Sequence, residues 1–189
     1  MEGMNSLNYL PYGNYTNRMA LENVLRYILR MGRHESRINE LVCYGGMGIP
    51  LYGTKEDIIN AMLYTQKVFN ISARGGRRAY HEVFNLNNET AEKIGKDPAS
   101  MYRYAMQCSE IYFSHGFQVV FAVHNGSHGT YKGYHIHFVI NSINFETGAK
   151  RHFNKKEFRE IGTEMRNRLP LEERILSLED IDKLLRGSD

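Results

Sequence analysis

The chain has 189 residues, 42% of them hydrophobic and 24% charged, so it can bury a core without disulfide or metal staples and is not disordered as a whole. Its net charge of +3 is too small to identify a polyanionic partner. No apolar run approaches membrane-spanning length.

Two isolated cysteines, Cys43 and Cys108, fit no metal or redox spacing. The first residues carry no signal-peptide pattern, so we expect a reducing cytoplasm and two free thiols. Repeats and low-complexity linkers are absent from the sequence. We therefore expect one domain over residues 1–189, and the abrupt end suggests that it is the N-terminal part of a longer protein.

The first half of the sequence predicts two helices and a strand. Helical periodicity extends over residues 20–32, and a glycine-rich loop follows at residues 43–53. A capping box before residues 55–70 starts a second helix. Weak alternation at residues 78–86 favours a strand. The apolar stripe of the first helix comprises Leu21, Val24, Leu25, Ile28 and Leu29.

The second half of the sequence contains the two clearest strands. Asp97 and Pro98 form the N-cap and first position of a helix over residues 99–116. Residues 118–125 and 134–145 alternate as strands, and the short loop between them requires an antiparallel pair. Two more helices are predicted, at residues 154–169 and 171–189. We conclude that the fold is α+β, with helices packed on an antiparallel sheet.

Four histidines lie in and between these two strands. Because side chains alternate across a strand, His135 and His137 project from one face. His124 lies on the equivalent face of the preceding strand and can reach them if the strands pair, whereas His128 lies in the loop. Three imidazoles on one sheet face form a plausible triad for a divalent ion, although spacing alone selects neither the metal nor the chemistry.

Basic residues gather in two segments. One is "ARGGRR", with Arg74, Arg77 and Arg78, and the other is "AKRHFNKK", with Lys150, Arg151, Lys155 and Lys156. Basic residues separated by glycine can follow a phosphate backbone, but either segment alone is equally consistent with a solvated loop.

The run from His124 through "YHIHFVINSINFETG" resembles the third motif of conjugative and mobilization relaxases (the MobP-like branch) in the HUH endonuclease superfamily. The segment "NYLPYGNYTNRMALENVLRYILRMG" is similar to the first motif, and "RAYHEVF" and "FSHGFQVVFAVH" keep the family's order and spacing. The resemblance covers about residues 8–155. It implies a central antiparallel sheet of about five strands with an HUH/RRM-like (ferredoxin-like) architecture.

The resemblance also implies an activity. Such enzymes nick one DNA strand at a transfer origin through a tyrosine that becomes joined to the 5′ phosphate. They use Mn²⁺ or Mg²⁺, with Zn²⁺ an option in a crystal. The metal ligands match His124, His135 and His137, and the nucleophile best matches Tyr27. Tyrosine ordinarily has a pKa of about 10, so it needs activation, which an ion on the scissile phosphate assists.

Helical geometry leaves Tyr27 exposed enough for this role. It lies ~130° from the centre of the apolar stripe at ~100° per residue, so it is not an obvious core aromatic. Three other tyrosines lie nearby in the sequence, and one of them remains an alternative nucleophile. These are Tyr9, Tyr12 and Tyr15.

Further roles follow from the resemblance. Glu110 is the candidate acid for orienting a histidine ligand or accepting the tyrosine proton, against the alternative of a solvated glutamate. The resemblance assigns His81 to phosphate contact or to support of the metal ligands, with a purely structural role equally open. Single-stranded and hairpin DNA are the expected partners, held by phosphate contacts and aromatic stacking. The candidate DNA-binding residues are Arg74, Arg77, Arg78, His81, Tyr131, Lys150, Arg151 and Lys155, with Tyr134 as a second stacking candidate.

The resemblance also implies an accessory relaxosome protein and a coupling protein as possible partners, and monomeric action. A rolling-circle replication initiator or transposase would use the same strand chemistry. Two other classes remain open from the sequence: a non-catalytic DNA-binding module, and a metal-dependent phosphoesterase that uses water as nucleophile.

Overall fold

The computed structural model describes residues 7–9, 15–50, 52–126, 133–150 and 155–169, and the predicted helix at 171–189 lies outside these. The elements in chain order are β1 (Leu7–Tyr9), α1 (Ala20–Ile28), the 3-10 helix η1 (Gly32–Glu40), β2 (Leu41–Met47), α2 (Lys55–Val68), α3 (Ile71–Arg74), β3 (Ala79–Asn85), α4 (Asn88–Ile94), α5 (Pro98–Phe113), β4 (Phe117–Gly126), β5 (Gly133–Asn144) and α6 (Lys155–Asn167).

The strands form one five-stranded sheet in the order β1-β3-β5-β4-β2, and every neighbouring pair is antiparallel. Four strands are long and β1 is a three-residue strand at one edge. The predicted α+β class with an antiparallel sheet of about five strands is confirmed. Strands β4 and β5 are the inner strands of a hairpin that β3 and β2 flank within the sheet. The strands that carry the histidines are therefore not at an edge.

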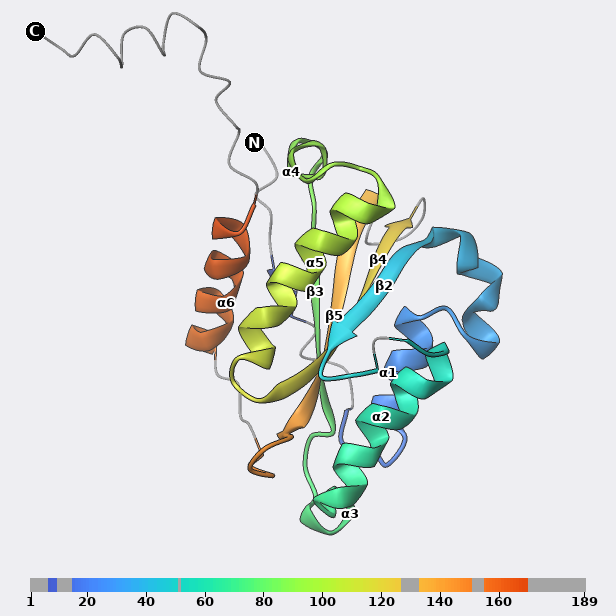
Figure 1. The fold of residues 1–189 in the computed structure, drawn as a ribbon, viewed down its shortest axis with the longest axis vertical. Coiled ribbons are helices and arrows are strands. Elements are labelled where there is room, and N and C mark those ends of the chain that lie inside the picture. Colours follow the sequence, from blue (N-terminus) through green and yellow to red (C-terminus); the bar gives the residue numbers. More distant parts are fainter. Residues whose placement is uncertain (1–6, 10–14, 51, 127–132, 151–154, 170–189) are drawn as a thin grey trace, which may run out of the picture.

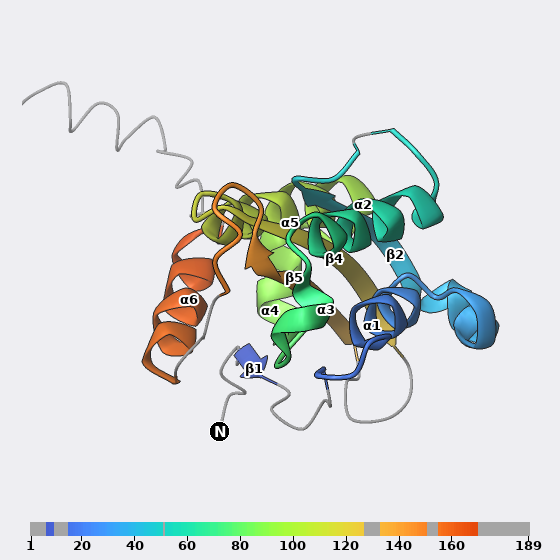
Figure 2. The same cartoon turned by 90° about the horizontal axis from the view of Figure 1, so that it is seen from below.

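Helices cover both faces of the sheet. One hydrophobic cluster joins α1 and α2 to Val120, Ala122 and Val139, and the other joins α4, α5 and α6 to the opposite side chains of the same strands. Figure 1 shows α5 beside α6, whereas α1 and α2 lie together away from them. In the view from below, α6 and α1 lie at opposite sides of the molecule (Figure 2). The sheet therefore separates two layers, and the layer of α1 and α2 faces the histidines.

The predicted starts of two helices are confirmed. Thr54 and Asp57 form a capping box: the Asp57 amide donates to the Thr54 hydroxyl and the Thr54 amide donates to the Asp57 carboxylate. Asp97 caps α5 by accepting from the Ser100 amide, and Pro98 is its first residue. The apolar stripe predicted for α1 is buried at all five positions.

The predicted glycine-rich loop at residues 43–53 was wrong in its first half, which is strand β2. A Cβ at Gly46 would overlap the carbonyl oxygen of Val119, and a Cβ at Gly45 would lie 2.7 Å from the Tyr102 ring. Glycine is normally unfavourable in a strand, but here the missing side chains let the edge strand approach β4 and α5 closely. Tertiary packing therefore overrides the local propensity.

Candidate metal centre and tyrosine site

The three predicted metal ligands meet on the sheet face that α1 covers. In the β4–β5 register His124 lies opposite His135, and Ala122 lies opposite His137. All three imidazoles are buried, and one ring nitrogen from each lies within 4.8 Å of the others. The predicted sharing of one face is confirmed, because pairing of the strands places His124 beside the other two.

A chain of hydrogen bonds determines which nitrogen of His137 is available. His137 Nδ1 lies 2.9 Å from His81 Nε2, and His81 Nδ1 lies 2.9 Å from the Tyr15 hydroxyl. The remaining nitrogen, His137 Nε2, is buried and has no hydrogen-bond partner among the described residues. An unpartnered buried lone pair is costly unless a ligand satisfies it. If His137 Nδ1–H donates to His81, Nε2 presents that lone pair to an ion, and His81 supports the ligand as carboxylates and carbonyls do in other metal sites.

The other two ligands are also fixed by backbone carbonyls. His124 Nε2 lies 2.7 Å from the Ile28 oxygen, and His135 Nδ1 lies 3.1 Å from the Gly133 oxygen. A carbonyl oxygen only accepts, so each of these nitrogens carries the proton and the other ring nitrogen carries the lone pair. Burial lowers the pKa of His124 to about 3 and the pKa of His137 well below 6.5, which keeps these rings neutral near pH 7. Neutral imidazole is the form that binds metal. The donor set therefore fits a divalent ion.

Tyr27 reaches the same site from α1. Its ring lies edge-on to His137 with centroids 5.6 Å apart, and edge-on to His81 at 6.2 Å. The ring is half-buried, as the helical geometry predicted, and its hydroxyl makes no hydrogen bond to a described residue. Tyr15 and Tyr27 line one pocket of about 350 Å³ with His81, Asn17 and Asn23, which we call the tyrosine pocket. Two tyrosines thus lie beside the candidate metal ligands, and the hydroxyl of one of them, Tyr15, is hydrogen-bonded to His81.

Arg30 is a site residue that sequence reasoning missed. It follows the α1 C-cap with φ +52°, a left-handed conformation that favours glycine. Its guanidinium is 2% exposed, and Nη2 donates to Glu40 at 2.9 Å and to His124 Nδ1 at 3.1 Å. The same group lies 5.1 Å from the Tyr27 ring centroid. Arg30 therefore joins the helix of Tyr27 to a metal ligand, at a backbone position where arginine is strained. Its hydrogen bond also occupies the His124 Nδ1 lone pair, so an ion that binds this nitrogen must displace the guanidinium from it.

Comparison with known families identifies the family of the chain. A family model described as "Relaxase: MobA/VirD2-like, nuclease domain" matches residues 27–172. The chain belongs to this family. Comparison with curated proteins and with solved structures gave no match. Among the described residues, no helix of this relaxase domain is long and apolar enough to cross a membrane.

Glu110 is not part of the relaxase site. It lies on α5, which covers the other face of the sheet, and its carboxylate pairs with Arg168 at 3.0 Å. The expected acid role was wrong because α5 and the histidines lie on opposite sides of the sheet. The solvated-glutamate alternative matches its exposed position.

His34 lies closer to the site than its loop sequence suggested. Its ring packs edge-on against Tyr27, with centroids 5.3 Å apart. Burial, followed by the charges of Arg33, Arg30 and Arg37, lowers the pKa of His34. The turn after α1 and the start of η1 return the chain to the Tyr27 ring.

The two predicted basic segments meet in space. Arg74 Nη1 donates to the Gly148 carbonyl at 2.6 Å, and Lys150 Nζ donates to the Gly75 carbonyl. Partial burial, and then the charges of Arg78 and Arg74, lower the pKa of Lys150. None of these three cations pairs with a described carboxylate. We call Arg74, Arg78 and Lys150 the basic cluster.

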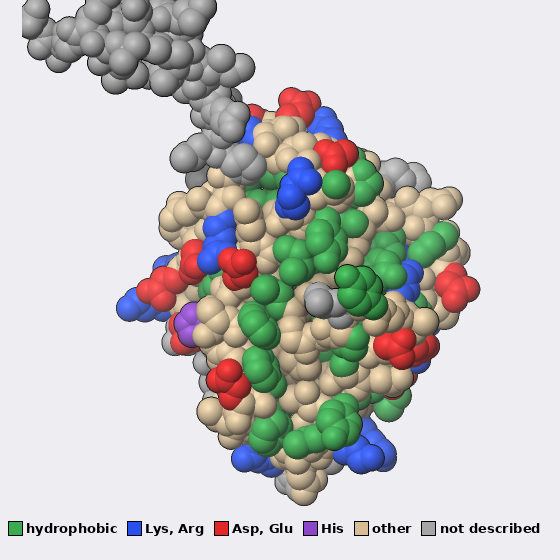
Figure 3. All heavy atoms as spheres, in the orientation of Figure 1, with side chains coloured by type: hydrophobic (Ala, Val, Ile, Leu, Met, Phe, Trp, Pro, Cys, Tyr) green, Lys and Arg blue, Asp and Glu red, His purple; other side chains and the backbone are tan. Residues whose placement is uncertain are grey.

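The structure describes only some of the remaining candidate DNA-binding residues. Arg77 lies over the Tyr80 ring at 5.1 Å, and the Tyr134 hydroxyl donates to the Lys96 carbonyl. Tyr12, Tyr131 and Arg151 lie outside the described residues, as do the side chains of Tyr9 and Lys155. The face of α5 and β2 carries scattered charges of both signs among hydrophobic side chains (Figure 3). That face lacks the one-sign character of the basic cluster.

Proposed function

We propose that this relaxase domain nicks and rejoins one DNA strand at a transfer origin through Tyr27, for conjugative transfer or mobilization of a plasmid or integrative element. In the nicking step Tyr27 Oη bonds to phosphorus and the bond from phosphorus to the 3′ oxygen breaks. The 5′ phosphate remains on tyrosine, and the released 3′ oxygen gains a proton while the phenol loses one. The observation that carries the proposal is the Tyr27 ring lying 5.6 Å from His137, whose Nε2 is buried and unpartnered.

A divalent ion, Mn²⁺ or Mg²⁺, held by His124, His135 and His137 would polarise the scissile phosphodiester and offset its charge. His81 and Tyr15 support this by holding His137 in one tautomer. Arg30 adds a positive charge beside the Tyr27 ring in a water-excluded setting, where such charges stabilise developing negative charge most strongly.

The basic cluster supports DNA as substrate. Three cations without carboxylate partners attract a polyanion, and Arg77 stacked on Tyr80 adds a fourth nearby. We extend the proposal to a hairpin and adjacent single strand as ligand, with Arg151, Lys155 and Tyr131 as further contacts. We also propose that the protein acts as a monomer in the cytoplasm, with a relaxosome accessory protein and a coupling protein as partners.

Among the residues whose side chains the structure describes, two tyrosines are candidates for the nucleophile, while Tyr9 and Tyr12 stay alternatives from the sequence. Tyr15 is held by His81 at 2.9 Å, whereas the Tyr27 hydroxyl is uncommitted. We assign the attack to Tyr27 because a reacting hydroxyl must be able to turn towards phosphorus, and Tyr15 is used to orient His81. A replication initiator or transposase would show the same step on a different DNA.

A denaturing gel tests the proposal. The protein is mixed with single-stranded oligonucleotides that tile the transfer origin of its element, with Mn²⁺. We expect a covalent band that disappears with EDTA and in Tyr27→Phe but persists in Tyr15→Phe. A band that persists in Tyr27→Phe and disappears in Tyr15→Phe would reverse the assignment. Turnover in both variants without any adduct would identify a water-using phosphoesterase, and bound DNA without cleavage would identify a binding module.

A further inference from the structure

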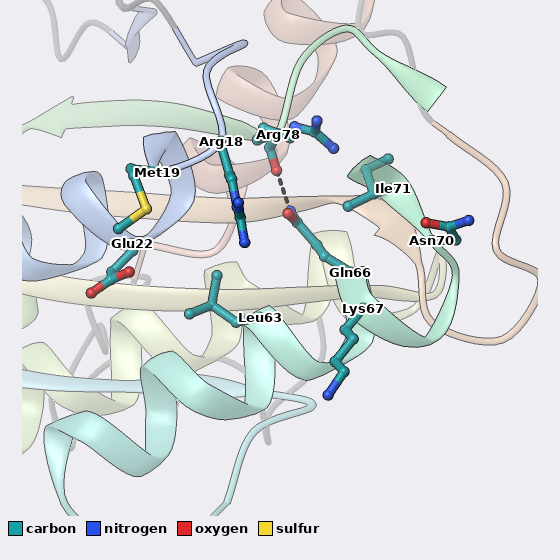
Figure 4. Close-up of a pocket in the computed structure, with 9 residues that line it drawn as sticks. All are labelled: Arg18, Met19, Glu22, Leu63, Gln66, Lys67, Asn70, Ile71 and Arg78. Carbon is teal, nitrogen blue, oxygen red and sulfur yellow. Dashed lines mark hydrogen bonds between the residues drawn. The ribbon is translucent and has the colours of Figure 1, made fainter. Parts of the chain in front are cut away.

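A second pocket lies between the start of α1 and the end of α2. Its volume is about 420 Å³ and we call it the α1–α2 pocket. Figure 4 shows Arg18 extending from the segment before α1 into the space beside Leu63 and Gln66. The lining residues are Arg18, Met19, Glu22, Leu63, Gln66, Lys67, Asn70, Ile71 and Arg78. None of them belongs to the metal ligands or to the tyrosine pocket.

The charge of this pocket favours an anion. Arg18, Lys67 and Arg78 form no ion pair with a described carboxylate. The one acidic lining residue, Glu22, is already paired with Arg26 at 2.9 Å. The lining therefore carries three positive charges and one negative charge, a net positive charge that attracts a negatively charged ligand.

Arg78 provides a second, independent observation. Only 7% of the residue is exposed, and within the part of the chain that the structure describes its buried Nε and Nη1 atoms have no hydrogen-bond partner. Its backbone is held on both sides: the amide donates to the Tyr15 carbonyl at 2.6 Å, and the carbonyl accepts from Gln66 Nε2 at 2.6 Å. Leaving a buried charged donor unsatisfied is costly, and an anion with several acceptor oxygens, such as a phosphate, relieves that cost.

The remaining lining residues suit the base of a nucleotide whose phosphate contacts Arg78. Met19, Leu63 and Ile71 are apolar, and Asn70 offers an amide with donors and an acceptor. Apolar side chains can pack against the face of a base, and an amide can hydrogen-bond its edge. A phosphate with an attached base therefore fits this set of side chains better than an inorganic anion alone.

The α1–α2 pocket lies next to the tyrosine pocket. Arg18, Met19 and Glu22 line the first, whereas Asn17, Ala20 and Asn23 from the same short segment line the second. Along the chain that enters β3, Arg78 and His81 are three residues apart, about 10 Å at 3.3 Å per residue. A single DNA strand with one phosphate at Tyr27 can thus continue into the α1–α2 pocket. From there it can reach the basic cluster, because Arg78 belongs both to the pocket and to the cluster.

We propose that the α1–α2 pocket binds a nucleotide of the same DNA strand, next to the nucleotides at Tyr27, with Arg78 as the buried phosphate contact. This inference rests on the proposed function, because it assumes that single-stranded DNA is the ligand. It adds a binding site for the uncut part of the strand that is separate from the histidines.

Fluorescence anisotropy tests the pocket without cleavage. Labelled thymidine oligomers of 2 to 12 nucleotides are titrated in EDTA against the wild-type protein and the double variant Arg18→Gln/Lys67→Gln. Both positions are exposed, so the variant keeps the buried Arg78 and the fold. Arg103→Gln, an exposed arginine on α5 across the sheet, is the matched control. Thymidine 5′-monophosphate is titrated as a competitor.

We expect the double variant to bind the longer oligomers about tenfold more weakly and to lower the salt slope by about 0.7 per lost contact, whereas the control changes neither. Equal binding by the wild type and the double variant would overturn the pocket and leave the nicking proposal intact. Competition by the monophosphate as strong as by the oligomers would assign the pocket to free nucleotides and overturn the inference. A wild-type protein that binds no oligomer would overturn both proposals.

Discussion

The backbone conformation of Arg30 and the contacts of its side chain have opposite effects on stability. A non-glycine residue in the left-handed region costs about 1–2 kcal/mol. The buried guanidinium offsets this through Glu40 and His124. The strain and the contacts can be separated by substituting Arg30 with glycine and with alanine.

We predict that Arg30→Gly is more stable than Arg30→Ala by about 1 kcal/mol, because only alanine keeps the strain at φ +52°. Both variants lose the guanidinium, so both lose most of the covalent adduct. Urea unfolding and the gel assay measure the two effects separately. Wild-type adduct yield in Arg30→Gly would show that Arg30 acts only on stability.

At the same scale, the sequence predicted some of the site residues and missed others. The alternation of a strand predicts that His135 and His137 share a face, and the short loop after His124 brings it beside them. Arg30 had no such signal, since a positive φ and a buried ion pair with Glu40 depend on how η1 folds back. Glu110 failed for the opposite reason: its helical position was read correctly, but the sequence does not state which face of the sheet α5 covers.

At the element scale, pairing of β3 with β5 buries His81, so its protonation changes the stability of the fold. Burial lowers the pKa of His81 to about 4, whereas an unfolded histidine titrates near 6.5. Between these values the unfolded chain binds a proton that the folded chain does not. The contribution of His81 to stability is therefore complete above pH 6.5 and is lost as the pH falls towards 4.

We predict that without metal the free energy of unfolding of the wild type falls more steeply from pH 7 to pH 4 than that of His81→Gln. The difference accumulated over this range is on the order of 3 kcal/mol. Urea unfolding in EDTA at several pH values measures it. His115→Gln is the control, because His115 is exposed. Parallel pH profiles of the wild type and His81→Gln would contradict the burial argument.

The same scale shows what limits prediction of the elements. Helix α1, from its apolar stripe, and helix α2, from its capping box, were predicted to within a few residues, because both signals are local. Strand β2 was missed, because its glycines are explained only by Val119 and Tyr102 on other elements. Contacts distant in sequence have no local pattern.

For the whole molecule, binding of a divalent ion should stabilise the fold. The ion binds the folded triad and not the unfolded chain, so at one hundred times the dissociation constant it adds about 2.7 kcal/mol. We predict that Mn²⁺ raises the urea midpoint of the wild type but not of His137→Ala. His115→Ala, which keeps the triad, should respond as the wild type does. An equal shift in His137→Ala would place the ion elsewhere.

The most direct measurement of the account is the site of covalent attachment. Trypsin cleavage after Arg18, Arg26 and Arg30 separates Tyr27, in the peptide "YILR", from the tyrosines of residues 1–18. Mass spectrometry of the digested DNA adduct should find the nucleotide phosphate on "YILR". A phosphate on the peptide of residues 1–18 would contradict the assignment of Tyr27 and place the nucleophile among Tyr9, Tyr12 and Tyr15.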